Sequence, residues 1–301
     1  MYDFHIHMYQ SKWDEELPRE FMKRTASAGI RGGAVFSPPP DSFVTQKISA
    51  GSWKEKLDCI FRFTSETPGF LPVFWIDPRE PDAEKQVQTA AEQGIHAFKI
   101  ICNRFFPKDI LPLLNSIAET GLPVIFHSGI LYSRYPAGEF NHPVQFECLQ
   151  QIPALKFSMA HLSWPWTAEL TSIAGELASH SRRYPGETCL MFTDLTPGTP
   201  KIFRRNALRE YFLTGYPELE NRTVWGSDCS VENYSADYAV KVLDFDRRCL
   251  SEISRDCEEY DISASRYAEL FDRITTRNFR NFFNLPDDSS EKENRIRSSE
   301  K

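Results

Sequence analysis

The chain has 301 residues, of which 41% are hydrophobic and 26% are charged, and it carries a formal net charge of −7. This composition is typical of a globular protein with a sizeable core, and the acidic balance excludes the basic surface that nucleic-acid binding needs. With seven cysteines but no Cys-x-x-Cys pair, no visible signal peptide and no apolar run that could span a bilayer, we expect a cytoplasmic protein.

Short apolar segments recur along the chain, and each is followed by a segment with helical periodicity. The predicted strands are, in chain order, YDFHIH (2–7), GAVFS (33–37), FLPVFWID (70–77), HAFKII (96–101), LPVIFHS (122–128), LKFSMAH (155–161), TCLMFTDL (188–195) and RTVWGSD (222–228). The helices expected between the first five strands are 14–29, 51–66, 82–94 and 108–121. Two further helical stretches, 235–259 and 263–283, follow the eighth strand.

Strands that are apolar throughout and alternate with helices indicate a parallel sheet buried on both faces. Eight such units are the number that closes a (β/α)₈ barrel, so we predict an α/β fold, a TIM barrel over residues 1–285 with extra C-terminal helices. An open doubly wound sheet is the alternative, but no Gly-x-Gly-x-x-Gly follows the first strand. Residues 286–301 are charged and serine-rich, and we expect a disordered tail there.

The first predicted strand contains two histidines, His5 and His7, one residue apart. Because alternate side chains of a strand share a face, His5 and His7 should lie on one face with Asp3. Phe4 and Ile6 should then take the opposite face, toward the covering helices. Two imidazoles on one face are able to bind a single cation.

Polar residues also mark the ends of later strands: His127 on the fifth, His161 on the sixth and Asp228 on the eighth. The active site of a (β/α)₈ barrel is built at these C-terminal strand ends, so the residues should meet His5 and His7 there. Three histidines and an aspartate form a ligand set that suits zinc and tolerates manganese, iron or cobalt. The structural alternatives are a core role for His127, a purely structural His161 and an N-cap role for Asp228.

This arrangement resembles the amidohydrolase superfamily. Within that superfamily, the segments LPVIFHSG, HPVQFECLQQIPALKFSMAHLSWPW, TVWGSDCS and ITTRNFRNFFNL are similar to the amidohydrolase-related branch that includes aminocarboxymuconate-semialdehyde decarboxylase. The resemblance implies a distorted barrel with one divalent ion, usually zinc. It also implies that His5, His7, His127 and Asp228 bind the metal, and that His161 is a catalytic or substrate-orienting residue. The chain departs from its relatives after His161, where Leu-Ser replaces the x-Gly that is common there.

Lys99, in the fourth strand, is a candidate substrate-binding residue. Some superfamily members bridge two metals with a carboxylated lysine near this position, so a binuclear site is an alternative. Arg104 and Arg134 follow the fourth and fifth strands, where either is able to hold a carboxylate by bidentate hydrogen bonds. Further residues expected at the mouth of the barrel are Trp75, Asn103, Phe105, Tyr132, Trp164 and Trp166.

We favour a metal-dependent hydrolase that cleaves an amide, ester or lactone bond of a small molecule through a metal-activated water. In that reaction Asp228 acts as general base, and His161 polarises the carbonyl or moves protons. A non-oxidative decarboxylase of a small unsaturated or aromatic carboxylic acid would use the same ligands, and a non-catalytic binding barrel is a third alternative. A serine hydrolase is disfavoured because no Gly-x-Ser-x-Gly is present. The expected partner is a small-molecule substrate, with no nucleic acid or membrane, and a homodimer is left open.

Overall fold

The computed structural model describes residues 1–10, 14–43, 51–132 and 136–286. Within these residues the strands form one parallel, nine-stranded sheet in the order β8-β7-β6-β5-β4-β3-β2-β1-β9. The strands are β1 Tyr2–His7, β2 Gly32–Phe36, β3 Phe70–Trp75, β4 Ala97–Ile100, β5 Val124–Phe126, β6 Lys156–Met159, β7 Leu190–Asp194, β8 Thr223–Val224 and β9 Cys229–Ser230. Of the expected tail, residues 287–301 lie outside the described part of the chain.

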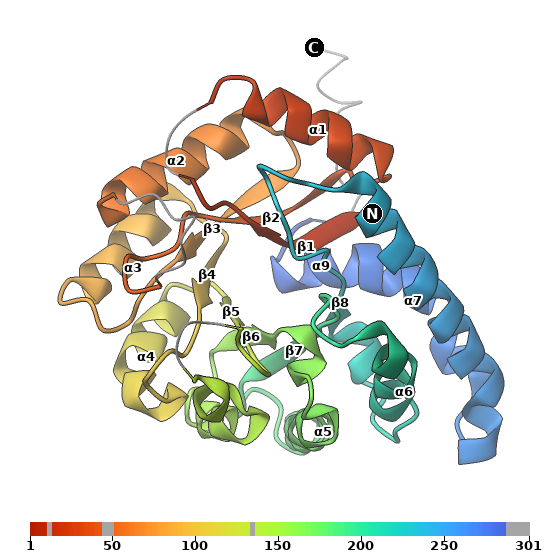
Figure 1. Ribbon diagram of the computed structural model, residues 1–301. Helices are drawn as coiled ribbons and strands as arrows, with labels where there is room; N and C mark the ends of the chain where they lie inside the picture. The colour runs from red at the N-terminus through yellow and green to blue at the C-terminus, as the bar shows by residue number, and fades with distance from the viewer. Residues whose placement is uncertain (11–13, 44–50, 133–135, 287–301) are drawn as a thin grey trace, which may run out of the picture.

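The sheet closes into a barrel because β8 and β9 belong to one extended segment between β7 and β1. β8 pairs with β7, and β9 pairs with β1. Between these two pairings, the Phe4 N–H donates to the Trp225 carbonyl at 2.9 Å and the Asp228 N–H donates to the His5 carbonyl at 3.0 Å. The predicted eighth strand is thus present but interrupted over residues 225–228, which include Asp228. The (β/α)₈ architecture is confirmed, with the helices arranged around the strands (Figure 1).

The helices that surround the barrel follow the predicted alternation. They are α1 Leu17–Ser27, α2 Trp53–Glu66, α3 Ala83–Gln93, α4 Leu111–Glu119, α5 Thr167–Arg183, α6 Lys201–Phe212, α7 Ala236–Asp256, α8 Leu270–Asp272 and α9 Asn278–Phe282. Ser52 and Glu55 form a capping box that starts α2, and Gly94, with φ of 92°, ends α3 in the left-handed conformation. Among the described residues, no helix combines the length and apolarity needed to cross a membrane.

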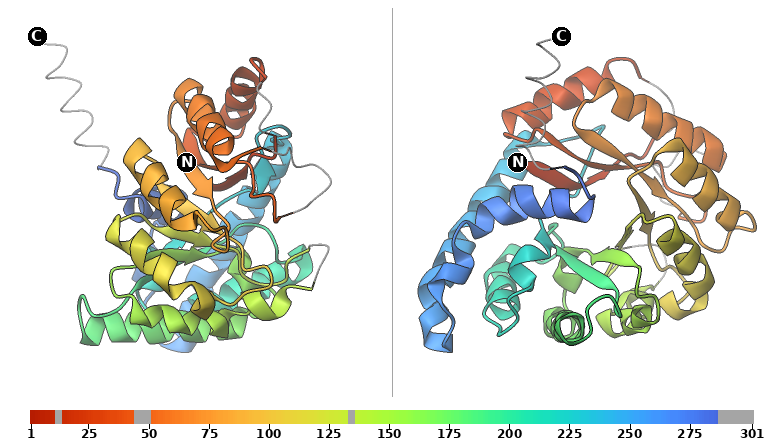
Figure 2. Two further views of the ribbon diagram at one scale, coloured as in Figure 1. Left: turned by 90° about the vertical axis from the view of Figure 1, so that its left-hand side faces the viewer. Right: turned by 180° about the vertical axis from the view of Figure 1, so that it is seen from behind.

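Two apolar layers hold the barrel together. One lies between the sheet and the outer helices, and the other fills the barrel interior with Phe4, Phe36, Val73, Ala97, Ile125 and Phe192. The C-terminal helix α9 closes the end of the barrel opposite the strand C-termini, where the ring of Phe282 lies 4.9 Å from that of Phe4. Seen from behind, α9 crosses this end of the barrel (Figure 2). Apolar side chains therefore fill the barrel at this end.

A β-bulge in β1 changes which side chains face the interior. Asp3 pairs with Gly33 and Ile6 pairs with Val35, so two residues of β1 lie opposite one residue of β2. The extra residue shifts the alternation, and Phe4 joins the interior layer while Ile6 joins the outer layer. The prediction that Phe4 and Ile6 share a face was therefore wrong.

The same bulge separates Asp3 from the two histidines, which corrects the prediction that all three share a face. The Asp3 carboxylate accepts hydrogen bonds from the N–H of His5 at 3.2 Å, the N–H of Ser227 at 2.9 Å and the hydroxyl of Tyr234 at 2.9 Å. Asp3 thus provides an acceptor for the His5 N–H at the bulge and ties β1 to the interrupted eighth strand.

Candidate metal centre

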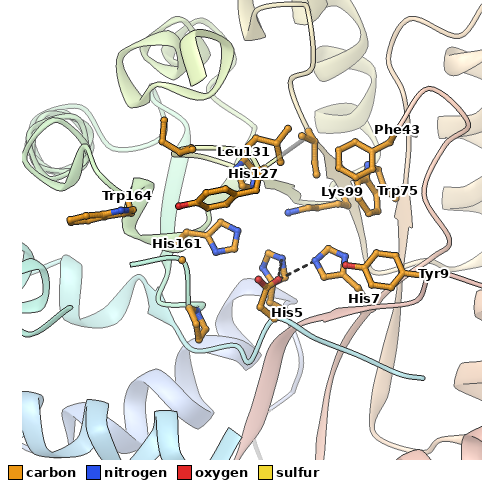
Figure 3. A pocket seen from close by; sticks show the side chains of 16 residues that line it. His5, His7, Tyr9, Phe43, Trp75, Lys99, His127, Leu131, His161 and Trp164 are labelled. Carbon is orange, nitrogen blue, oxygen red and sulfur yellow. Dashed lines mark ion pairs between the residues drawn. The ribbon is translucent and has the colours of Figure 1, made fainter. Parts of the chain in front are cut away.

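A cavity of about 430 Å³ opens at the C-terminal ends of the strands. Its floor contains His5, His7, His127, His161 and Asp228, all of which line it. The labelled histidines come from different sides of the barrel and converge on one space (Figure 3). His127 and His161 were expected inside strands, but they lie one and two residues beyond the ends of β5 and β6. The five residues that the sequence singled out are therefore brought together by the fold.

His5 is oriented by a carboxylate that the sequence analysis did not identify. The Nδ1 atom of His5 lies 2.6 Å from Oδ2 of Asp194, the last residue of β7. Asp194 also accepts hydrogen bonds from the N–H of Thr196, at 2.7 Å, and from its hydroxyl. With Nδ1 occupied, Nε2 of His5 faces Asp228, 3.6 Å from Oδ1. A carboxylate on the remote nitrogen is the usual partner of a metal-binding histidine.

One feature of the sequence points to Asp194. It stands in FTDL at the end of the seventh predicted strand, which is the same edge of the sheet that carries the histidines. An acidic residue at that edge is a candidate by the rule that was applied to Asp228. Its partner His5, however, is 189 residues away, so no spacing pattern links the two.

The remaining donors are close to one another, and each of the other three histidines has one nitrogen without a hydrogen bond among the described residues. Ligand atoms of His5, His161 and Asp228 all lie within 4.8 Å of one another, and Nε2 of His7 lies 3.2 Å from Oδ1 of Asp228. Nδ1 of His7, Nε2 of His127 and Nδ1 of His161 are buried and have no hydrogen-bond partner among the described residues. Such atoms are costly to bury unless something binds them. The donor set therefore fits a divalent cation.

His7 and His127 do not belong to the set of atoms within 4.8 Å. His127 instead packs against His161, with ring centres 4.9 Å apart. His161, which was expected to act on substrate, is a member of the closest set. The side chains that the sequence assigned to the metal and to catalysis are thus in direct contact with one another.

Burial keeps the imidazoles in the form that binds cations. It lowers the pKa of His5 and of His127 well below the ordinary value, and that of His161 to about 4. These rings are therefore neutral at pH 7, with a lone pair free to bind a metal. Burial also acts to raise the pKa of Asp228, but the hydrogen bond from His7 and the nearby imidazoles hold it below the ordinary value. The set accordingly combines neutral nitrogens with one anionic oxygen donor.

The backbone at two of these positions is strained. His161, Leu162 and Ser163 have φ of 63°, 49° and 50°, and Asp228 has φ of 61°, all in the left-handed region. Non-glycine residues rarely adopt this region, and strain of this kind persists where the surrounding structure enforces it. Here it directs the His161 and Asp228 side chains into the cavity.

Two glycines allow the backbone to approach the histidines closely. A Cβ on Gly198 would lie 2.7 Å from Cβ of His161, and one on Gly226 would lie 2.6 Å from Cβ of His5. Contacts this short are not tolerated, so any larger residue would displace the imidazoles. The glycines are therefore part of the support of the site.

Lys99 contributes a buried positive charge. It lies one residue before the end of β4, has no solvent exposure, and its Nζ is 5.0 Å from the centre of the Phe36 ring. Its Nζ has no hydrogen-bond partner among the described residues. Burial lowers the pKa of Lys99 to about 8, although the neighbouring Asp194 and Asp228 act in the opposite direction. An anionic group of a ligand in the cavity would find a cation here.

The residues expected at the mouth fall into two groups. Trp75, Tyr132 and Trp164 line the cavity together with Lys99. Arg104, Asn103, Phe105 and Trp166 do not line it; Trp166 packs against His142, with ring centres 4.5 Å apart. Arg134 lies outside the described residues. The sequence analysis missed Tyr9, Phe43 and Leu131, which also line the cavity.

Comparison with known protein families identifies a match over most of the chain. Residues 2–256 match the amidohydrolase family model, and the chain belongs to this family. Members of this superfamily generally bind a metal in the active site. No curated protein sequence matches the chain.

Several solved structures share the fold. One is a protein from Pseudomonas putida assigned as a 2-pyrone-4,6-dicarboxylic acid hydrolase, with 17% identity, a TM-score of 0.56, and coverage of 94% of this chain and 97% of that one. Another is an uncharacterised TIM-barrel protein from Bordetella bronchiseptica, with 14% identity, a TM-score of 0.60, and coverage of 94% and 99%. An amidohydrolase from Burkholderia multivorans has 11% identity, a TM-score of 0.54, and coverage of 95% and 99%. At these identities the similarity shows the fold alone.

Proposed function

We propose that the protein is a metal-dependent hydrolase that cleaves an amide, ester or lactone bond of a small molecule. The observation that carries the proposal is the convergence of His5, His7, His127, His161 and Asp228 on the lining of one cavity of about 430 Å³. Ligand sites of a few hundred Å³ take small molecules, and the family is one of enzymes that use a metal. A small-molecule substrate is therefore the expected partner.

His5, His7, His127 and Asp228 would hold the ion, and His161 would remain free for substrate. Neutral imidazoles with one carboxylate favour zinc over calcium or magnesium, while manganese, iron and cobalt are also compatible with the set. When bound, such an ion supplies a Lewis acid that activates water near neutral pH.

The chain's own residues supply the other functions of the reaction. Asp228 is ionised and faces the cavity, so it would accept a proton from the attacking water. His161 is neutral, and its Nδ1 has no hydrogen-bond partner in the described part of the chain, so it would orient the substrate carbonyl or transfer a proton to the leaving group. Lys99 would stabilise negative charge that develops on the substrate. Trp75 and Trp164 would enclose the apolar part of the substrate.

The test is an assay of small lactones, amides and esters, together with aromatic and muconate-like acids, on protein loaded with zinc or with manganese. We expect hydrolysis of one class, and turnover in Asp228→Asn lower by about 10²–10⁴-fold because the general base is lost. Asp261→Asn is the matched control, since Asp261 also has a left-handed backbone, φ of 56°, but lies outside the cavity lining.

Three other results of this assay would change the proposed function or the proposed role of Asp228. Release of carbon dioxide from the acids without hydrolysis of the other compounds would identify a decarboxylase. A metal content of zero after careful purification, with no turnover on adding metal, would contradict the proposal. An Asp228→Asn variant with a normal rate would move the general base to His161.

A further inference from the structure

A second cavity, of about 480 Å³, lies beside the first, between the start of α6 and helix α7. Pro197 and Gly198 line both cavities, so one short segment of chain forms the wall between them. None of the histidines lines this second cavity. Lys201, Arg204 and Lys241 line it instead. The largely apolar side chains of Tyr238, Val242 and Phe245 also line it.

The start of α6 places positive charge where a helix least favours it. The helix begins with Lys201, its first turn contains no acidic residue, and Pro200 provides no side-chain cap. The N-terminal end of a helix carries a partial positive charge and exposes N–H groups, so cations there are destabilising unless an anion is near. Within the first turn of α6 itself, no acidic side chain offsets this charge.

Arg204 supplies an independent observation. It is only 4% exposed, and its Nε and Nη2 each donate to the carboxylate of Asp246 at 2.6 Å. Nη2 also donates to the carbonyl of Leu195. The Nη1 group is buried and has no hydrogen-bond partner among the described residues, although Arg204 lines the cavity. A buried guanidinium with one idle N–H group is costly, and an anion bound beside it would satisfy that group.

We propose that this second cavity binds the carboxylate of a small organic acid with an apolar body. The carboxylate would be held by Arg204 and by the two lysines, while the body packs on Phe245 and Val242. The acid is either a distal part of the substrate, which reaches past Pro197 and Gly198, or a separate effector. The first of these sources rests on the proposed function, but the site itself does not.

A ligand in the second cavity would affect the candidate metal centre through the segment that separates the two cavities. Gly198 lies against the His161 ring, and the hydroxyl of Thr199 donates to the His161 carbonyl at 3.4 Å. Thr199 and Gly198 both line the second cavity. A ligand there contacts the same residues that support His161.

The first experiment measures binding by calorimetry on the full chain, with 3-phenylpropionate as the probe and the uncharged 3-phenylpropanamide as its counterpart. We expect the acid to bind more tightly than the amide, with an affinity that falls as salt is raised. Lys201→Gln and Lys241→Gln should each weaken binding of the acid by about 2- to 5-fold, as expected for partly exposed charge pairs. Arg204 is left intact because removing one partner of a buried ion pair endangers the fold.

The matched control is Lys54→Gln. Lys54 is also an exposed lysine in the first turn of a helix and lies over an aromatic ring, 5.5 Å from the centre of Trp53, as Lys201 lies 5.1 Å from the centre of Phe245. This variant should bind the acid as the unmodified protein does. Equal affinity for acid and amide, or equal loss in all three lysine variants, would overturn the proposal.

A second experiment separates the two sources of the acid. With a panel compound that is turned over, 3-phenylpropionate should raise KM without changing kcat if the cavity is a substrate subsite. If it is an effector site, the acid should change kcat. Binding without turnover of any panel compound would contradict the proposed hydrolase and leave the binding site standing.

Discussion

His5 and Asp194 form a buried pair whose atoms Nδ1 and Oδ2 are 2.6 Å apart, and it connects the first strand of the barrel to the seventh. Both side chains are at most 1% exposed. Because Asp194 holds Nδ1, the ring of His5 has a single orientation, with Nε2 toward Asp228. The pair therefore positions His5, a proposed metal ligand, through a residue that does not line the cavity itself.

Asp194→Asn should reduce the affinity for zinc by about 10- to 100-fold, because the variant loses the charge that orients His5 and raises its basicity. The measurement is competition with a chromophoric chelator. Asp77→Asn is the control, since Asp77 is also a buried aspartate that follows a strand but pairs with Arg79, at 2.8 Å, and not with a histidine of the site. Equal zinc affinity in Asp194→Asn and the unmodified protein would show that the pair serves only the fold.

His161→Ala and His7→Ala should separate catalysis from metal binding. We expect His161→Ala to keep its metal and lose about 10²–10⁴ in turnover, whereas His7→Ala loses the metal. Elemental analysis and kinetics on the same preparations test this, with His180→Ala, a substitution in α5 outside the cavity lining, as the control. Loss of metal from His161→Ala to the same extent as from His7→Ala would make His161 a ligand.

Gly198→Ala should disturb His161 without removing any polar group of the site. The added Cβ would lie 2.7 Å from Cβ of His161, so we expect destabilisation of about 1–3 kcal/mol and a clear loss of turnover. Gly215→Ala is the matched control because nothing lies within 4 Å of its added Cβ. Urea denaturation and kinetics measure the two effects. Normal turnover in Gly198→Ala would mean that the loop after β7 does not position His161.

Phe282→Ala should destabilise the barrel from the end away from the site. The Phe282 side chain has no solvent exposure, and its ring lies 4.9 Å from that of Phe4 and 5.2 Å from that of Phe192. Removing it should lower the free energy of unfolding by about 3–5 kcal/mol, while zinc affinity is retained. Tyr260→Ala, at a residue that is 48% exposed, should change the free energy of unfolding by less than about 0.5 kcal/mol. Equal stability of the two variants would show that α9 does not close the barrel.

The sequence by itself was sufficient to predict the barrel and the end of it at which the candidate site residues meet. Strand and helix periodicities are local properties, so eight alternating units can be read directly from the order of apolar residues. The placement of His127, His161 and Asp228 at strand ends follows from the same pattern, because all parallel strands of a barrel end at one side. These inferences need no knowledge of which residues touch.

Only the tertiary structure decided how these residues are held. The bulge that turns Phe4 inward and Ile6 outward depends on pairing β1 with β2, and the partner of His5 is 189 residues away. Which residues contact His161 and which cations meet beside α6 are likewise set by segments that are distant along the chain. A strand's alternation is determined by its own residues, whereas its register and its side-chain partners are determined by the neighbours with which it packs.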